Sequence, residues 1–174
     1  ALIGLPLKQA FTDLLPITDE MGEQCVETYR RLFNENNALY VIPTFPNVME
    51  TLHQLHEQGY TLTIASSRSN RSLMEFVNDM QLNDVIPYVL GAEDVTHAKP
   101  YPDPVLQTLE TFGCKPEDAL VLGDTWYDIE MGRRAGVRTC GVTYGNGSRE
   151  ELMRAGADFL VDDFGKLLKL ASGK

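Results

Sequence analysis

A carboxylate stands directly after a short apolar stretch near the middle of the C-terminal half. Residues 119–122 are apolar, Gly123 and Asp124 follow, and Asp128 comes four residues later. In α/β proteins ligands bind outside the carboxyl ends of the strands, and Mg²⁺ prefers carboxylate oxygens. The spacing therefore predicts Asp124 as a direct Mg²⁺ ligand and Asp128 as a residue behind it or reached through water. The alternative is a helix cap at Asp124 and a surface acid at Asp128.

A second polar group ends another apolar stretch. Residues 61–65 lead into Ser66 and Ser67, and a helix-like pattern follows. A hydroxyl at a strand end, next to the free N–H groups of a helix N-terminus, can hold phosphate oxygens. We expect Ser66 and Ser67 to bind such an anion, with a plain capping cluster as the alternative.

Lys99 lies in a stretch that prolines stiffen, at positions 100, 102 and 104. Proline fixes its own backbone torsion, so this lysine is held more firmly than an ordinary solvated one. An ammonium group in a fixed place can neutralise a phosphate and a nearby carboxylate. The alternative is a surface lysine without a role in chemistry.

The elements that must position these groups alternate along the chain. From Pro43 onward, helical patterns separate short apolar strands, which indicates a parallel sheet covered on both faces. Before Pro43, Thr18 can cap a helix with an apolar face, which residues 34–37 should end. We expect a doubly wound α/β fold, Rossmann-like, with residues 1–42 as a helical appendage and residues 43–174 as the core. The predicted strands are 61–66, 88–91, 119–122, 139–142 and 159–161.

Composition narrows the class of protein. The 174 residues carry a net charge of −10, and such a field repels nucleic acid. No apolar run is long enough to span a bilayer, and no signal peptide is indicated, so we expect a cytoplasmic protein without a membrane partner. The three cysteines lack metal-ligand spacing and are expected to pack as small apolar side chains.

The order Ser66, Lys99-Pro100, then GDxxxD at 123–128, resembles the second, third and fourth motifs of the haloacid dehalogenase (HAD) superfamily, in its phosphoglycolate phosphatase-like branch. The likeness extends to residues 91–95, 145–148 and 155–158. It implies a Mg²⁺-dependent phosphatase acting on a small phosphorylated metabolite. By this resemblance Ser66 and Lys99 are catalytic, Ser67 helps to bind substrate, Asp124 ligates the metal and Asp128 supports it. The first residues resemble part of the helical cap that closes over the substrate in that branch.

One motif of that superfamily has no match in this chain. Its nucleophile is the first Asp of a DxD motif on the first strand, and such an aspartate forms an aspartyl-phosphate. Asp13 and Asp19 stand in helical sequence, and Asp162-Asp163 lacks the spacing, although a permuted nucleophile there is an alternative. By resemblance the absent strand lies between the strands that end at Ser66 and Asp124. We expect further residues ahead of Ala1, or another chain, to fill the gap, and no stable, active monomer from these 174 residues alone.

Other functions remain open at this point. A sugar-phosphate mutase of the β-phosphoglucomutase type shares these motifs, and a catalytically incomplete module that binds phosphate and metal would keep them too. A hydrolytic dehalogenase fits less well, because such relatives lack the GDxxxD pattern. The specific phosphate ester and the oligomeric state cannot be predicted from these residues.

Overall fold

The computed structural model describes residues 4–37 and 43–172. Strands and helices alternate along the core as predicted, and the fold is the expected α/β class with parallel strands. The predicted boundary at residues 42 and 43 falls against residues 38–42, which lie outside the described residues. No helix in the described part of the chain is both long and apolar enough to cross a bilayer.

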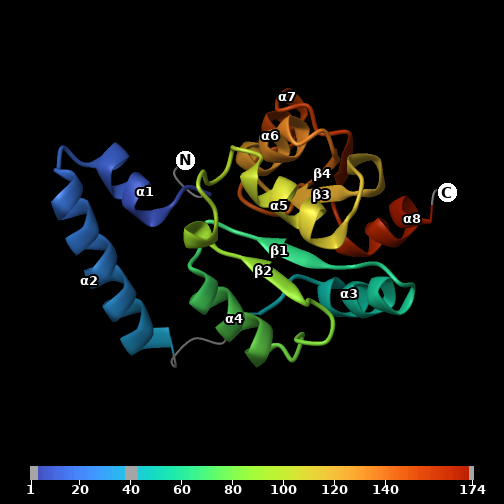
Figure 1. The fold of residues 1–174 in the computed structure, drawn as a ribbon, viewed down its shortest axis with the longest axis horizontal. Helices are drawn as coiled ribbons and strands as arrows, with labels where there is room; N and C mark the ends of the chain where they lie inside the picture. Colours follow the sequence, from blue (N-terminus) through green and yellow to red (C-terminus); the bar gives the residue numbers. More distant parts are fainter. Residues whose placement is uncertain (1–3, 38–42, 173–174) are drawn as a thin grey trace.

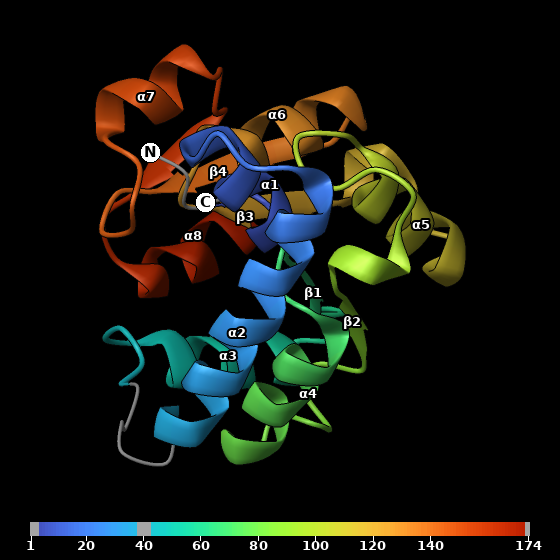
Figure 2. The same cartoon turned by 90° about the vertical axis from the view of Figure 1, so that its left-hand side faces the viewer.

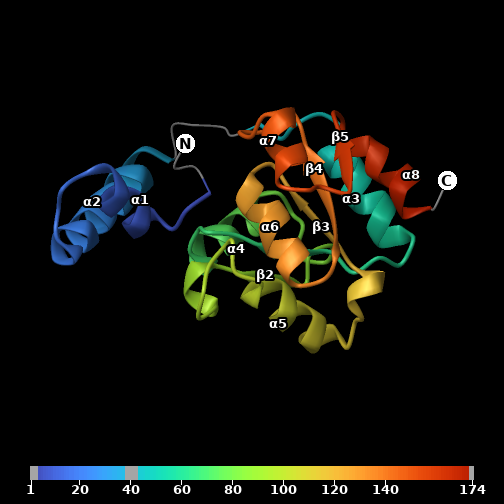
Figure 3. The same cartoon turned by 90° about the horizontal axis from the view of Figure 1, so that it is seen from above.

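The N-terminal part is a hairpin of two helices, α1 (Leu7–Leu14) and α2 (Asp19–Asn37), which stands to one side of the core (Figures 1 and 3). Thr18 caps α2 as predicted, because its hydroxyl oxygen accepts a hydrogen bond from the Met21 amide at 3.3 Å. Residues 34–37 do not end this helix, as the sequence suggested, but continue it. Asn and Glu are tolerated in an exposed helix, where a local break in the apolar pattern costs little.

The N-terminal segment contacts the core at its beginning and near the end of α2. At one end, the Ser67 hydroxyl donates to the Gly4 carbonyl at 2.5 Å. At the other, the Arg68 guanidinium lies between the Phe33 ring of α2, at 5.6 Å, and the Phe76 ring, at 4.5 Å. Figure 2 shows α2 running down beside helix α4 of the core. Both contacts come from the segment that follows the first strand.

The parallel strands form two sheets rather than one. Strand β1 (Thr63–Ala65) pairs with β2 (Tyr88–Leu90), and β3 (Leu120–Gly123) pairs with β4 (Arg138–Val142), which pairs with β5 (Phe159–Val161). Within residues 4–37 and 43–172, no hydrogen-bonded ladder joins β1 to β3. The break falls where the sequence predicted that a central strand is absent.

Burial along the strands runs opposite to that of a complete doubly wound sheet. In such a sheet the inner strands are buried on both faces. Here β1 and β3, on either side of the break, have only exposed or half-buried residues, whereas β4 is buried over four of its five residues. Ile64 and Leu122 are half-buried, while Leu90 and Cys140 are buried. The two strands beside the break are thus the least covered.

Helices hold the two sheets together from both faces. Helices α5 (Asp103–Phe112) and α6 (Trp126–Arg134) share one apolar cluster that includes Ala65 of β1 and Val121 of β3. Helices α3 (Val48–Glu57) and α4 (Asn70–Asp79) pack on β1 and β2, and α8 (Leu167–Ala171) packs on the other sheet. The remaining helix, α7 (Arg149–Arg154), packs against α6. The strand ends therefore keep a fixed relation although no strand links them.

Helix α5 begins at Asp103, whose carboxylate contacts the His97 ring nitrogen at 3.1 Å. Pro104 follows within the first turn, where a missing N–H is tolerated. The helix ends at Phe112, and Gly113 follows with a φ of 59°, in the left-handed region that favours glycine.

The cysteines give a simple test of the packing. All three are free thiols, and Cys140 is fully buried in β4 whereas Cys25 and Cys114 are half-buried. Burial raises the pKa of the Cys140 thiol to about 11, and the thiolate is the reactive form. We expect two thiols of the native protein to react with a thiol reagent at pH 8, and the third only after unfolding. Equal reaction rates for all three would contradict this packing.

Candidate functional site

Asp124 follows strand β3 directly, as the sequence predicted, and the loop after β4 holds its carboxylate. The Oδ2 atom accepts hydrogen bonds from the backbone amide of Asn146 at 2.8 Å and from its side-chain Nδ2 at 2.6 Å. The Asp124 carbonyl accepts from the Gly147 amide at 2.8 Å. Within the described residues, the hydrogen bonds to this carboxylate all end on Oδ2. Oδ1 is left as the oxygen available to a cation.

Two glycines allow this close approach. A Cβ atom on Gly145 would lie 2.2 Å from Cβ of Asp124, and one on Gly147 would lie 2.4 Å from its carbonyl oxygen. No side chain larger than hydrogen fits at either position without a shift of the loop. The strands bring the loop there, because β3 and β4 pair in register with Gly123 opposite Gly141.

Asp128 is not a surface acid, because its side chain is 7% exposed and fully engaged in hydrogen bonds. Its Oδ1 accepts from the Lys99 ammonium at 2.5 Å. Its Oδ2 accepts from the amide and the hydroxyl of Thr125, at 3.0 and 2.7 Å. Helix α6 begins after Thr125, so this residue, and not Asp124, takes the cap position. The two alternatives for these acids, a helix cap at Asp124 and a surface acid at Asp128, are therefore wrong.

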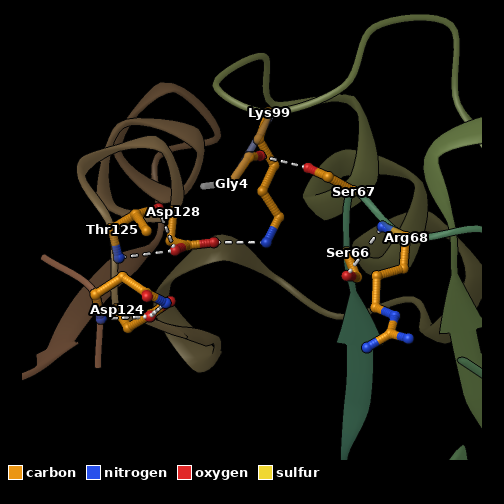
Figure 4. A network of polar contacts seen from close by, with 9 residues as sticks. Gly4, Ser66, Ser67, Arg68, Lys99, Asp124, Thr125 and Asp128 are labelled. Atoms are coloured by element: carbon orange, nitrogen blue, oxygen red, sulfur yellow. Dashed lines mark hydrogen bonds and ion pairs between the residues drawn. The ribbon is translucent and has the colours of Figure 1, made fainter. Parts of the chain in front are cut away.

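Lys99 links the two sheets at their carboxyl ends, because it follows β2 and pairs with Asp128, which follows β3. Its side chain is 14% exposed and reaches down from the loop after β2 toward the space between Asp128 and Ser66 (Figure 4). Ser66 follows β1, and its hydroxyl oxygen accepts from the Arg68 amide at 3.2 Å, which leaves its proton for another acceptor. The Arg68 guanidinium points away from this space (Figure 4). Ser66, Lys99, Asp124 and Asp128 thus lie around one region at the strand ends (Figure 4).

Ser67 and the start of α4 differ from the expected phosphate cradle. The single hydroxyl proton of Ser67 is donated to the Gly4 carbonyl. At the helix start, the Asn70 amide donates to the Glu93 carboxylate at 2.9 Å, and the Ser72 amide donates to the Ser69 hydroxyl at 3.4 Å. The amides of Asn70 and Ser72 therefore bind the chain's own oxygens, so the start of α4 is not the open anion site that the sequence predicted, whereas Ser66 and Lys99 still have protons to donate.

The charges of the site favour a cation. Lys99 and Asp128 neutralise one another as a close ion pair, so Asp124 adds one uncompensated negative charge. A phosphate dianion would be repelled by that charge unless a divalent cation reversed it. Asp124 offers a hard oxygen of the kind that Mg²⁺ takes. Among the described residues, no group of three or more His, Cys, Asp or Glu side chains lies close enough to hold a metal ion, so Asp124 alone is an incomplete ligand set.

Sequence reasoning left Thr125 and Asn146 without a role. Thr125 stands between two predicted site residues, and its position ahead of Asp128 by three residues is a capping pattern that could have been noticed. Asn146 lies between two glycines after a predicted strand, which is a signal for close backbone approach. Neither pattern shows which side chain would be contacted.

A parallel α/β core with a hydroxyl, a lysine and two carboxylates at adjacent strand ends is the architecture of the predicted superfamily. A family model described as haloacid dehalogenase-like hydrolase matches residues 1–142. The chain therefore belongs to the haloacid dehalogenase-like hydrolases, and the resemblance inferred from its motifs is confirmed.

Curated relatives and a solved structure place it among phosphatases. The chain is 35% identical over 186 residues to the "Probable phosphatase IndB" of Dickeya dadantii, covering 99% of this chain and 79% of that protein. It is 32% identical over 170 residues to "Pyrophosphatase PpaX" of Anoxybacillus flavithermus, covering 98% and 77%. A crystal structure described as a predicted phosphoglycolate phosphatase from Haemophilus somnus superimposes with a TM-score of 0.80 at 26% identity, covering 88% of this chain and 68% of that one.

Proposed function

We propose that this chain forms the phosphate- and metal-binding part of a Mg²⁺-dependent phosphatase that hydrolyses a small phosphate monoester. The observation that carries the proposal is the convergence of Ser66, the Lys99–Asp128 pair and Asp124 at the carboxyl ends of β1 and β3. Relatives named as phosphatases support the reaction class.

Each residue has a distinct part in this proposal. Ser66 donates its hydroxyl proton to a phosphoryl oxygen, and Lys99 stabilises the charge on the transferring group. Asp128 holds Lys99 in place, because its other oxygen is fixed by Thr125. Ser67 reaches substrate only by giving up its bond to Gly4, which ties its part to movement of the hairpin. We propose that the hairpin, in residues 1–42, acts as a cap over this site.

Asp124 is the proposed metal ligand, through Oδ1, and Asp128 supports the metal indirectly. Bound Mg²⁺ would supply positive charge that offsets the phosphate. Asp124 alone does not complete an octahedron, so waters, substrate oxygens and a further acid are proposed to contribute.

The attacking group is proposed to come from a parallel strand seated between β1 and β3. Such a strand would pair with both open edges and bring an aspartate to the same carboxyl end as Ser66 and Asp124. Asp163 is a poor candidate, because its oxygens accept from the Asn47 side chain at 2.7 Å and from the Gly165 amide at 2.8 Å. The further strand can belong to the same protein or to a partner.

Inorganic pyrophosphate is a second candidate substrate. The name of the PpaX relatives points to it. The Ser66 hydroxyl, the Lys99 ammonium and the metal would bind a phosphoryl group of pyrophosphate as well as that of a phosphate monoester. With the strand that carries the proposed nucleophile supplied, comparing release of phosphate from pyrophosphate, phosphoglycolate and a hexose phosphate, with product analysis for the last, separates these activities and the mutase reaction.

The test of the proposal separates binding from turnover. In the state in which the chain folds, self-associated or with a partner in the gap, we expect it to bind inorganic phosphate only when Mg²⁺ is present, measured by calorimetry or by fluorescence of its single tryptophan, Trp126. EDTA should abolish this binding. With p-nitrophenyl phosphate we expect no Mg²⁺-dependent hydrolysis by this chain alone.

Two results would count against the proposal in different ways. Mg²⁺-dependent turnover by the chain alone would contradict the external nucleophile. Phosphate binding that is unchanged by EDTA or by Asp124→Asn would contradict the metal site.

A further inference from the structure

Asn70 joins the loop that follows β1 to the loop that follows β2. Its side-chain Nδ2 donates to Oδ2 of Asp94 at 2.6 Å and to the Val89 carbonyl at 3.2 Å. The same Asp94 oxygen accepts from the Gly91 amide at 2.7 Å, and the Asn70 backbone amide donates to the Glu93 carboxylate at 2.9 Å. Asn70 therefore ties the start of α4 both to β2 and to the loop behind it.

The Asn70 side chain is not needed to cap its own helix. Ser69 takes the cap position of α4, and its hydroxyl oxygen accepts from the Ser72 amide at 3.4 Å. Asparagine is also a weaker helix former than most residues, because its amide competes for backbone hydrogen bonds. Asn70 is thus better explained by the loop that it contacts than by the helix that it begins.

The two loops are also in direct backbone contact. A Cβ atom on Gly91 would lie 2.3 Å from the Asn70 nitrogen and 2.9 Å from the Arg68 carbonyl oxygen. That carbonyl accepts from the Ala92 amide at 2.9 Å. Only a hydrogen atom fits between the loops at Gly91, so the position of one loop fixes that of the other.

Ser66, the proposed donor to phosphate, begins the loop that Asn70 holds. Its hydroxyl oxygen accepts from the Arg68 amide at 3.2 Å, so the direction of its free proton depends on where Arg68 lies. Arg68 is in turn placed by the bond from its carbonyl to the second loop. Lys99 follows that second loop further along the chain, but its ion pair with Asp128 fixes it separately. A change at Asn70 therefore reaches Ser66 first.

We propose that Asn70 is a positioning residue for phosphate binding: through its contact with Asp94, it holds the loop after β1 so that the Ser66 hydroxyl faces the phosphoryl group. The inference rests on the proposed function, because it takes Ser66 as a donor to phosphate. It adds a residue that acts on the phosphoryl group only through the loop.

The first test removes the contact from either side. Inorganic phosphate is titrated by calorimetry, with Mg²⁺ present and in the state in which the chain folds, into wild type, Asn70→Ala, Asp94→Ala and Asp94→Asn. We expect both alanine variants to lose about tenfold in phosphate affinity, the effect of weakening one hydrogen bond to a charged group. Asp94→Asn keeps an oxygen that can accept from both Asn70 and Gly91, so it should bind phosphate as wild type does.

The second test asks whether Asn70 acts through Ser66. Double-mutant cycles measure such coupling between residues, so phosphate affinity is compared among Ser66→Ala, Asn70→Ala and the double variant. Once the Ser66 hydroxyl is gone, its direction no longer matters, and the double variant should bind no more weakly than Ser66→Ala. Additive losses would overturn the proposed role of Asn70.

Two variants of the same helix serve as controls, and circular dichroism checks that every variant is folded. Asn78→Ala removes an exposed asparagine of α4, and Val77→Ala weakens its buried face; both should leave the phosphate affinity of the folded protein unchanged. Asn70→Ala that binds phosphate like these controls would overturn the role of Asn70 and leave the phosphate site intact. Wild-type binding that is unchanged by Ser66→Ala would overturn the phosphate site, and the positioning role with it.

Discussion

Replacing Lys99 with methionine should lower the free energy of unfolding by about 3 kcal/mol or more and weaken phosphate binding by about 10- to 100-fold. Removing one partner of a buried ion pair typically costs roughly 3–5 kcal/mol, because the other charge stays buried without its partner. Asp128 is 7% exposed, and the two Thr125 donors compensate only in part. The loss of phosphate affinity follows from a hydrogen bond to a charged group, worth about 1.5–3 kcal/mol.

The unfolding free energy is measured by denaturant titration followed through Trp126 fluorescence, and phosphate affinity by calorimetry with Mg²⁺ present. Lys115→Met is a matched control, since Lys115 also precedes a proline but is exposed. The double variant with Asp128→Asn should regain part of the stability but none of the phosphate affinity. If Lys99→Met were as stable as Lys115→Met, the Lys99–Asp128 ion pair would contribute nothing to the free energy of unfolding.

Gly123→Ala should cost about 3 kcal/mol of stability and disrupt the site as well. A Cβ at this position would lie 2.0 Å from Cβ and 2.3 Å from Cγ of Asp128. Overpacking a filled interior costs roughly 1–3 kcal/mol, occasionally more, and Asp128 cannot move aside without losing Lys99 and Thr125. We therefore expect loss of Mg²⁺-dependent phosphate binding together with the loss of stability.

Gly132→Ala separates crowding in general from damage to the site. Its Cβ would lie 2.6 Å from Cγ2 of Thr139, so it is also overpacked, but it contacts none of the proposed site residues. Its destabilisation should be smaller, because alanine is favoured over glycine inside a helix by about 1 kcal/mol. Phosphate binding should persist. If Gly123→Ala bound phosphate as wild type does, the proposed dependence on Asp128 would be wrong.

Sequence patterns located the strand ends well and therefore the residues attached to them. A strand that ends in a polar residue is visible from its apolar run, so the positions of Ser66 and Asp124 could be predicted directly. In a parallel fold these ends share an edge, which is why Lys99 could be expected nearby. The break between β1 and β3 followed from the missing first motif, and the two-sheet topology agrees with it.

What the sequence could not show are contacts that depend on packing between distant elements. Lys99 and Asp128 are 29 residues apart, and only the placement of α5 and α6 over both sheets decides that they meet. Asn146 reaches Asp124 because β3 and β4 are neighbours in register, a relation that no local pattern encodes. The Glu93 carboxylate accepts a hydrogen bond from the Asn70 amide at the start of α4. This contact also depends on how distant elements pack, and it occupies one of the amides that the sequence had suggested for phosphate.

The break in the sheet also bears on how copies of this chain behave toward one another. An unpaired strand edge is a template on which another chain can add, and this molecule has two of them facing one gap. The net charge of −10 holds copies apart only over a distance that salt controls, about 30 Å at 0.01 M ionic strength and about 10 Å at 0.1 M. We therefore expect ionic strength to govern whether copies of this chain associate through the gap, so that its solubility depends on the same two strand edges between which the proposed nucleophile strand would pair.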